Sequence, residues 1–198
     1  MRIFDTDIEF CLRIAKELSE QYHQYAQPPR DLKSIDDLVW LIGETIEGTI
    51  TIYDLHFEAG RMMVRGVFVA LQDGNFEINL PADLGEREQR FNRCKELFHV
   101  ALDDDQCRNM DFWDHVEESQ ISFTIAESDP SSPVVQEMLA EIAAMEFLFP
   151  CERRTSELAD AGESPDFEAL ATKYGISQVQ IEYYLSDRMM AEFAKVNW

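Results

Sequence analysis

Residues 95–99 (Lys-Glu-Leu-Phe-His) differ at one position from the zinc-binding helix motif His-Glu-x-x-His. In that motif two imidazoles four residues apart share one helix face, and the glutamate serves as general base. Here Glu96 and His99 keep their places, but Lys95 stands where the first imidazole belongs. A protonated ammonium has no lone pair for a metal ion. The segment therefore predicts either a metal site with an altered ligand set or a site in which the lysine replaces the metal.

A second helix, predicted at residues 134–149, adds two carboxylates. It is apolar around most of its circumference, which is typical of a buried helix, yet it contains Glu137 and Glu141 one turn apart. A buried carboxylate without a partner costs several kcal/mol or stays protonated. A metal, a histidine or an ammonium would serve as partner, and the first helix offers His99 and Lys95. Glu141 either shares this buried position or reaches the surface.

The elements that position these residues follow from periodicity. Apolar side chains at helical spacing predict helices at 5–26, 35–47 and 86–102. Alternating or continuous apolar stretches predict strands at 49–55, 64–71 and 76–80, with a hairpin turn at 73–74. Tight turns between short strands favour an antiparallel sheet.

The motifs resemble those of the ImmA/IrrE family of regulatory metallopeptidases. The first block, residues 90–99, is similar to the family pattern R-F-T-x-A-H-E-L-G-H. The second, residues 137–150, is similar to E-x-L-C-N-x-x-A-x-E-L-L-M-P. Residues 64–80 resemble the sheet of the family, and residues 167–177 resemble its C-terminal helix pair.

By position, the resemblance implies His99 as second zinc ligand, Glu137 as third and Glu96 as general base. The chain departs from the family where Lys95 replaces the first ligand, Phe98 replaces a glycine, and Glu141 replaces an asparagine. The implied fold is α+β: N-terminal helices, a small antiparallel sheet and a zincin-like pair of crossing helices within residues 1–152. A polar linker at 155–165 would lead to a C-terminal helical pair at 166–198, packed on this domain.

Composition limits the classes of partner. The chain has 17 Lys and Arg against 39 Asp and Glu, for a formal charge of −22, which argues against binding nucleic acid or anionic lipid directly. A basic protein partner fits this charge. Four cysteines without a C-x-x-C pair suggest neither a disulfide framework nor a zinc ribbon. No apolar stretch approaches the roughly 20 residues of a membrane span, so a cytoplasmic protein is expected.

Three interpretations of the site remain open. If a metal binds, Asp103 is a third candidate ligand beside His99 and Glu137, and this harder set suits Mn²⁺ or Mg²⁺ better than structural zinc. If no metal binds, the Lys95 ammonium takes the cation's place and pairs with Glu137, with Glu141 or Asp103 as further partners; we prefer this interpretation. The third is a neutral Lys95 acting as base or nucleophile.

The resemblance implies a protein that relieves repression by a helix-turn-helix repressor of a mobile element or stress gene. With Lys95 in the ligand position, the leading hypothesis is a catalytically impaired member that acts by binding its repressor. The alternative is a working metallo-endopeptidase with a non-standard ligand set and Glu96 as base. A third hypothesis is an interaction module without a repressor partner.

Overall fold

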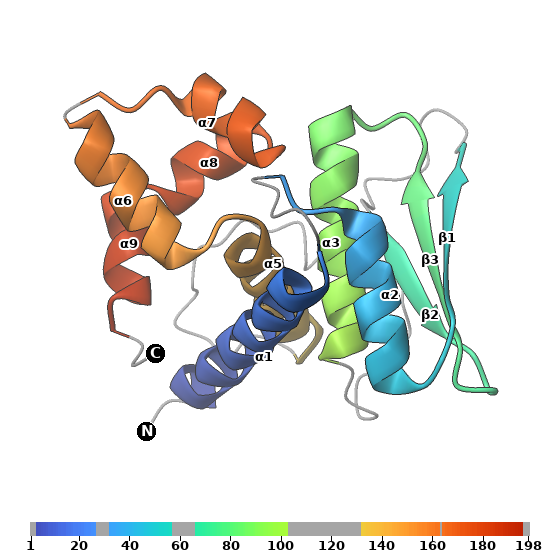
Figure 1. Ribbon diagram of the computed structural model, residues 1–198. Helices are drawn as coiled ribbons and strands as arrows, with labels where there is room; N and C mark the ends of the chain where they lie inside the picture. The colour runs from blue at the N-terminus through green and yellow to red at the C-terminus, as the bar shows by residue number, and fades with distance from the viewer. Residues whose placement is uncertain (1–2, 27–31, 57–65, 103–131, 163, 196–198) are drawn as a thin grey trace.

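The computed structural model describes residues 3–26, 32–56, 66–102, 132–162 and 164–195. Within these residues the chain is an α+β protein with eight helices and one three-stranded sheet (Figure 1). The helices are α1 (Ile3–Tyr25), α2 (Ile35–Ile46), α3 (Glu86–Ala101), α5 (Ser132–Leu148), α6 (Cys151–Ala161), α7 (Phe167–Tyr174), α8 (Gln178–Tyr184) and α9 (Asp187–Phe193). The strands are β1 (Ile50–Leu55), β2 (Val67–Ala70) and β3 (Phe76–Pro81).

The sheet is mixed, so the predicted antiparallel sheet is wrong in one of its two pairings. The strand order is β1-β3-β2, and β2 pairs antiparallel with β3 across the predicted turn, where Gly74 has φ +83°. In contrast, β1 runs parallel to β3, with Ile52 opposite Ile78. The tight turn joins only β2 and β3, and β1 and β2 lie on opposite sides of β3. Sequence turn signals could not reveal this strand order.

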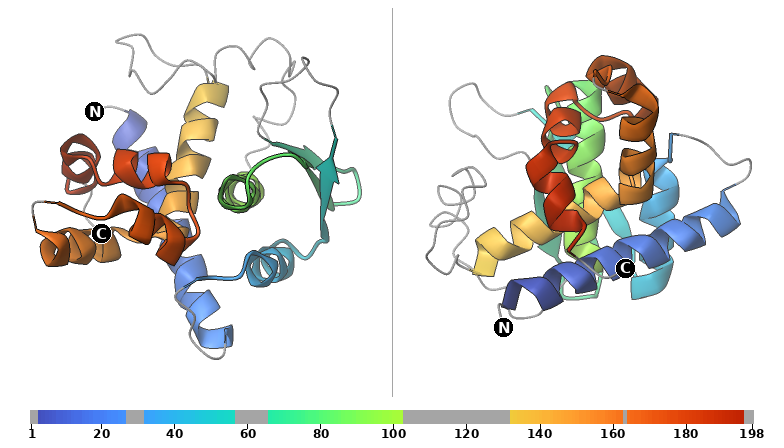
Figure 2. Two further views of the ribbon diagram at one scale, coloured as in Figure 1. Left: turned by 90° about the horizontal axis from the view of Figure 1, so that it is seen from above. Right: turned by 90° about the vertical axis from the view of Figure 1, so that its left-hand side faces the viewer.

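One face of the sheet packs against α3, which lies between the sheet and α5 (Figure 2, left). Alternate residues of β3, namely Phe76, Ile78 and Leu80, are buried. This alternation is expected where one face of a strand meets the core. On its other side α3 contacts α5 and α2, and α5 also packs along α1. The helix that carries the sequence motif is therefore enclosed by four elements, which fixes the direction of its side chains.

A buried lysine joins three segments beside this core. The Lys33 ammonium donates to Ser19 Oγ on α1 and to the carbonyl of Phe147 at the C-terminal end of α5, both at 2.6 Å. It also lies 4.2 Å from the centre of the Phe147 ring. Burial lowers the pKa of Lys33 to about 8. Lys33 thus satisfies a terminal carbonyl of α5 that has no partner within its own helix.

The chain passes directly from α5 into α6, and the predicted linker at 155–165 is instead mostly helical. Arg154 of α6 is fully buried, with Nη2 2.7 Å from Glu146 Oε2 on α5 and its guanidinium 4.2 Å from the Phe193 ring centre. The Cys151 backbone N–H also donates to Glu146. This buried pair makes α6 part of the core. The small polar residues of this segment instead suggested a linker, because the sequence does not show which helix Arg154 contacts.

The Glu146 carboxyl predicts a pH dependence of folding. Burial raises its pKa to about 7, against the opposing influence of Arg154 and the Cys151 N–H. Between the ordinary carboxyl pKa of 4.5 and pH 7 the folded state therefore binds more protons than the unfolded state, so the free energy of unfolding falls as pH rises. We expect a decline of roughly 2–3 kcal/mol across this window. Urea unfolding at several pH values measures it.

The matched comparison is Glu146→Gln, which is expected to be less stable at all pH values but to lack this decline. Glu20→Gln, on an exposed face of α1, should keep the wild-type decline. An equal pH slope in wild type and Glu146→Gln would contradict the assignment.

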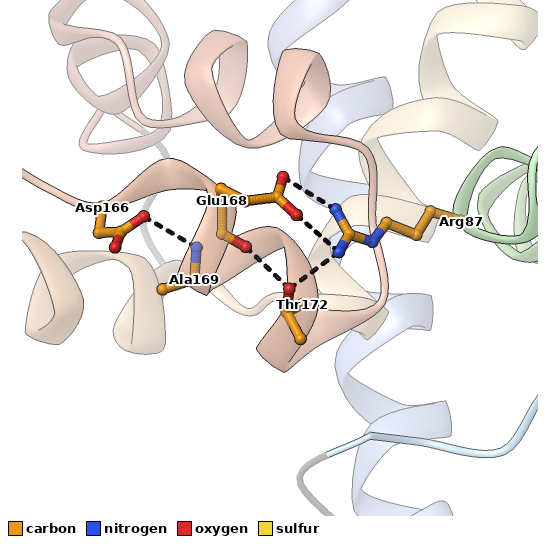
Figure 3. A network of polar contacts seen from close by, with 5 residues as sticks. All are labelled: Arg87, Asp166, Glu168, Ala169 and Thr172. Atoms are coloured by element: carbon orange, nitrogen blue, oxygen red, sulfur yellow. Dashed lines mark hydrogen bonds and ion pairs between the residues drawn. The ribbon is translucent and has the colours of Figure 1, made fainter.

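The C-terminal segment contains three helices rather than the predicted pair. Ser186 begins the additional helix, α9, because its side chain accepts a hydrogen bond from the Met189 N–H. Figure 3 shows how α7 is attached to α3: Arg87 forms a two-bond ion pair with Glu168 at 3.0 and 2.9 Å and also donates to Thr172. Tyr174 stacks on Phe149 with ring centres 3.9 Å apart.

None of the helices in the described part of the chain combines the length and apolar character required to cross a membrane.

Candidate functional site

The packing of α3 against α5 brings four of the sequence-predicted residues together. Lys95 Nζ lies 2.6 Å from Glu137 Oε2 and 3.1 Å from Glu96 Oε1. On the next turn of α3, His99 Nε2 lies 3.0 Å from the other oxygen of Glu137. Glu137 therefore bridges the two residues at the ligand positions of the motif. We call Lys95, Glu96, His99 and Glu137 the α3–α5 charge cluster.

Exposure divides this cluster into a buried floor and an open edge. The side chains of Glu96, His99 and Lys95 are 2%, 7% and 12% exposed, whereas that of Glu137 is 41% exposed. The ammonium is thus held between one buried carboxylate and one that meets solvent. Glu137 was expected to be buried but is half-exposed, because residues 135–138 are only partly covered, whereas most residues from 139 to 149 are buried.

The charge states follow from these contacts. Burial alone would lower the pKa of Lys95, but the attraction of Glu96 and Glu137 outweighs it and raises that pKa above its ordinary value. Burial likewise opposes ionisation of Glu137, yet Lys95 and His99 lower its pKa below the usual range. Lys95 is consequently a cation and Glu137 an anion at neutral pH. A neutral, nucleophilic Lys95 does not fit this environment.

His99 is held by the sheet as well as by α5. Its ring stacks on Phe68 of β2, with centres 5.3 Å apart and planes 10° from parallel. Its Nε2 is close enough to Glu137 for ion pairing but is not aligned as a hydrogen bond. The contact between Glu96 Oε1 and Lys95 is of the same kind. The contact of Lys95 with Glu137, in contrast, is both an ion pair and a hydrogen bond, at 2.6 Å.

Gly66, just before β2, is the second residue of the sheet that shapes the cluster. A Cβ atom at this position would lie 2.5 Å from Glu96 Oε1 and 2.8 Å from its Cδ. The backbone therefore passes over the Glu96 carboxylate at a distance that only glycine permits. A glycine beside a strand often marks such a close approach, so the sequence held a signal for Gly66; the stacking of Phe68 had none.

We predict that Gly66→Ala destabilises the fold by about 1–3 kcal/mol, as an overpacked buried site does. Glu96 is 1% exposed and cannot move away into solvent. Thermal and urea unfolding measure the loss. In a Glu96→Ala background the same substitution should lower the free energy of unfolding much less, because the Glu96 atoms that the new Cβ would overlap are absent. If the losses of unfolding free energy in the two single variants simply add in the double variant, residue 66 and Glu96 are not in steric contact, and the prediction is wrong.

The other two candidate residues lie apart from this arrangement or beyond the described chain. Glu141 accepts a hydrogen bond from the Tyr184 hydroxyl of α8 at 3.3 Å, so it links α5 to the C-terminal helices. Asp103 falls outside the described residues. Whether Asp103 could act as the third metal ligand therefore lies outside what the described residues show.

The described residues do not fit the zinc ion that the family resemblance implies. A catalytic zinc site takes three protein ligands and a water. Here His99 and Glu137 supply two donors, and the first ligand position of the motif holds the charged Lys95. Within the described ranges no group of three His, Cys, Asp or Glu side chains is arranged to hold a metal. The Lys95 ammonium instead supplies the positive charge between the carboxylates.

No model of a known protein family matches the chain, and no curated protein matches it significantly. The resemblance to the ImmA/IrrE family thus depends on the motifs described above.

Proposed function

We propose that this protein is a regulatory binding protein that relieves repression by a helix-turn-helix repressor without cleaving it. The observation that supports the absence of cleavage is the 2.6 Å ion pair between Lys95 and Glu137. It engages a carboxylate that a metal would need and fills the first ligand position with a positive charge. Hydrolysis by a metal-activated water would require Glu137 to be released from Lys95 and the ammonium to leave the first ligand position.

Charge supports a basic protein as the partner. A chain with a formal charge of −22 repels nucleic acid but attracts the DNA-facing surface of a repressor. Binding to that surface would compete with DNA, which is enough to relieve repression. Long-range attraction of this kind also speeds association, and salt weakens it. The helix-turn-helix repressor is inferred from the motif resemblance, and the acidic surface is the property of this chain that suits it.

The test is to mix the protein with a candidate helix-turn-helix repressor from the same genome and to measure complex size by light scattering and repressor mass by mass spectrometry. We expect a stable complex that contains intact repressor and releases it from operator DNA. Glu96→Gln should act like wild type in the release assay. Repressor fragments that form with wild type but not with Glu96→Gln would establish the peptidase alternative. The absence of any complex would favour an interaction module with another partner.

A further inference from the structure

Two largely exposed aromatic side chains, one from α2 and one from α1, contact each other at the solvent-facing side of α2. Trp40 of α2 is 50% exposed and Tyr25, at the end of α1, is 63% exposed. Their ring centres are 5.4 Å apart and their planes meet at 78°. The opposite side of α2 is buried through Ile35, Leu38, Leu41 and Ile42. Tyrosine and tryptophan are enriched at protein–protein interfaces relative to the rest of the surface.

Three carboxylates surround Trp40 on the same helix. Asp36 and Asp37 precede it by four and three residues and Glu44 follows it by four, so all three are its neighbours on the helix surface. All are exposed, and the structure shows no ion pair from any of them to another described residue. Asp36 and Asp37 belong to the first turn of α2, where they also favour the helix dipole. The surface formed by Tyr25, Asp36, Asp37, Trp40 and Glu44 is called the α2 aromatic-acidic surface.

Exposed aromatic rings beside carboxylates favour a cationic ligand. An indole or phenol face attracts a cation through its quadrupole, and a guanidinium also stacks on it as a plane. Carboxylates one helical turn away bring the same cation to the ring and repel anions. An apolar ligand would leave the carboxylates without partners, and a second copy of this chain would bring two strongly acidic surfaces together. The chemistry therefore favours an arginine-bearing partner.

We infer that the α2 aromatic-acidic surface binds an arginine side chain presented by a basic protein segment, through stacking on Trp40 and pairing with the surrounding carboxylates. This rests on the proposed function only in assigning that segment to the repressor. The surface contains none of the four residues of the α3–α5 charge cluster. The inferred arginine-binding surface on α2 and the α3–α5 charge cluster are therefore two separate sites.

The probe is a labelled alanine-based helical peptide with arginines at i and i+4, compared with the same peptide carrying neutral citrulline. Affinity is measured by fluorescence anisotropy, and contact at the surface by the indole N–H resonance of Trp40, assigned with Trp40→Phe. We expect the arginine peptide to bind and to shift that resonance, and the citrulline peptide to do neither. Trp40→Ala should weaken binding about two- to fivefold, the range for an exposed cation–π contact.

Charge-matched variants separate local recognition from general attraction to an acidic protein. The triple variant Asp36→Asn, Asp37→Asn, Glu44→Gln should weaken binding about threefold or more. The control triple variant Glu9→Gln, Glu17→Gln, Glu20→Gln removes the same charge from exposed positions of α1 and should lose much less. Circular dichroism confirms that each variant is folded.

Equal losses in the two triple variants would mean diffuse attraction and would overturn the inference. So would an unmoved Trp40 resonance. A loss with Tyr53→Ala, on the sheet, but not with Trp40→Ala would place binding on the sheet and would also overturn it. These outcomes are independent of the repressor assay, because a peptide that fails to bind leaves the repressor complex to be judged separately, and a missing repressor complex leaves the peptide result intact.

Discussion

Replacing Lys95 by methionine is expected to lower the free energy of unfolding by about 3–5 kcal/mol at neutral pH, the range for breaking a buried ion pair from one side. The substitution leaves Glu96, which is 1% exposed, and Glu137 without their shared cation. Two carboxylates then repel each other in a poorly solvated place. Urea or thermal unfolding measures the loss.

The pH dependence of this loss identifies its cause. Because the folded-state pKa of Glu137 is lowered, its stabilising contribution is present above the ordinary value of 4.5 and disappears as pH falls. The deficit of Lys95→Met should therefore shrink as the pH is lowered through 4.5. Lys173→Met is the matched control, since Lys173 also lies 2.6 Å from a glutamate but its side chain is 47% exposed. That control should lose less than about 1 kcal/mol. Similar losses in the two variants would contradict a central role for Lys95.

Replacing Lys95 by histidine is expected to convert the cluster into a zinc site. The substitution restores the His-Glu-x-x-His pattern and removes the ammonium, so that two imidazoles of α3 and the Glu137 carboxylate supply three ligands. We expect near one zinc per chain by elemental mass spectrometry. We also expect a rise in unfolding free energy of about 2.7 kcal/mol when free zinc is one hundred times the dissociation constant.

The double variant Lys95→His, Glu137→Gln serves as the control and should lose this metal and the stabilisation together. If Lys95→His folds normally but binds no zinc, position 95 does not correspond to the first ligand position of a zinc site. That result would contradict the equivalence of residues 95–99 with the His-Glu-x-x-His motif.

The sequence was sufficient for much of the architecture. Helical spacing located α1, α2, α3 and α5 within a few residues, and the Asp73-Gly74 signal located the β2–β3 hairpin. These features depend on local periodicity and turn chemistry, which a single sequence records directly. The parallel direction of β1 depends instead on its pairing with β3, a contact between strands about 26 residues apart that no local pattern records.

Tertiary contacts account for the other differences. The helical character of α6 follows from the buried Arg154, whose partner Glu146 lies on another helix. In the candidate site, spacing on α3 indicated Lys95, Glu96 and His99, and the unlikely position of carboxylates in an apolar helix indicated Glu137. A glycine beside the predicted strand was the one signal for the close approach of Gly66 to Glu96, whereas the stacking of Phe68 on His99 is visible only once the sheet is folded against α3.

The most direct test of the central claim, that the Lys95 ammonium takes the place of a metal ion, is elemental mass spectrometry on untagged wild-type protein. The protein is purified without chelator and dialysed against zinc and, separately, manganese. We predict no stoichiometric metal with either ion. Near one metal per chain, lost on Glu137→Gln or His99→Ala, would contradict the claim and make cleavage assays on the repressor the next experiment.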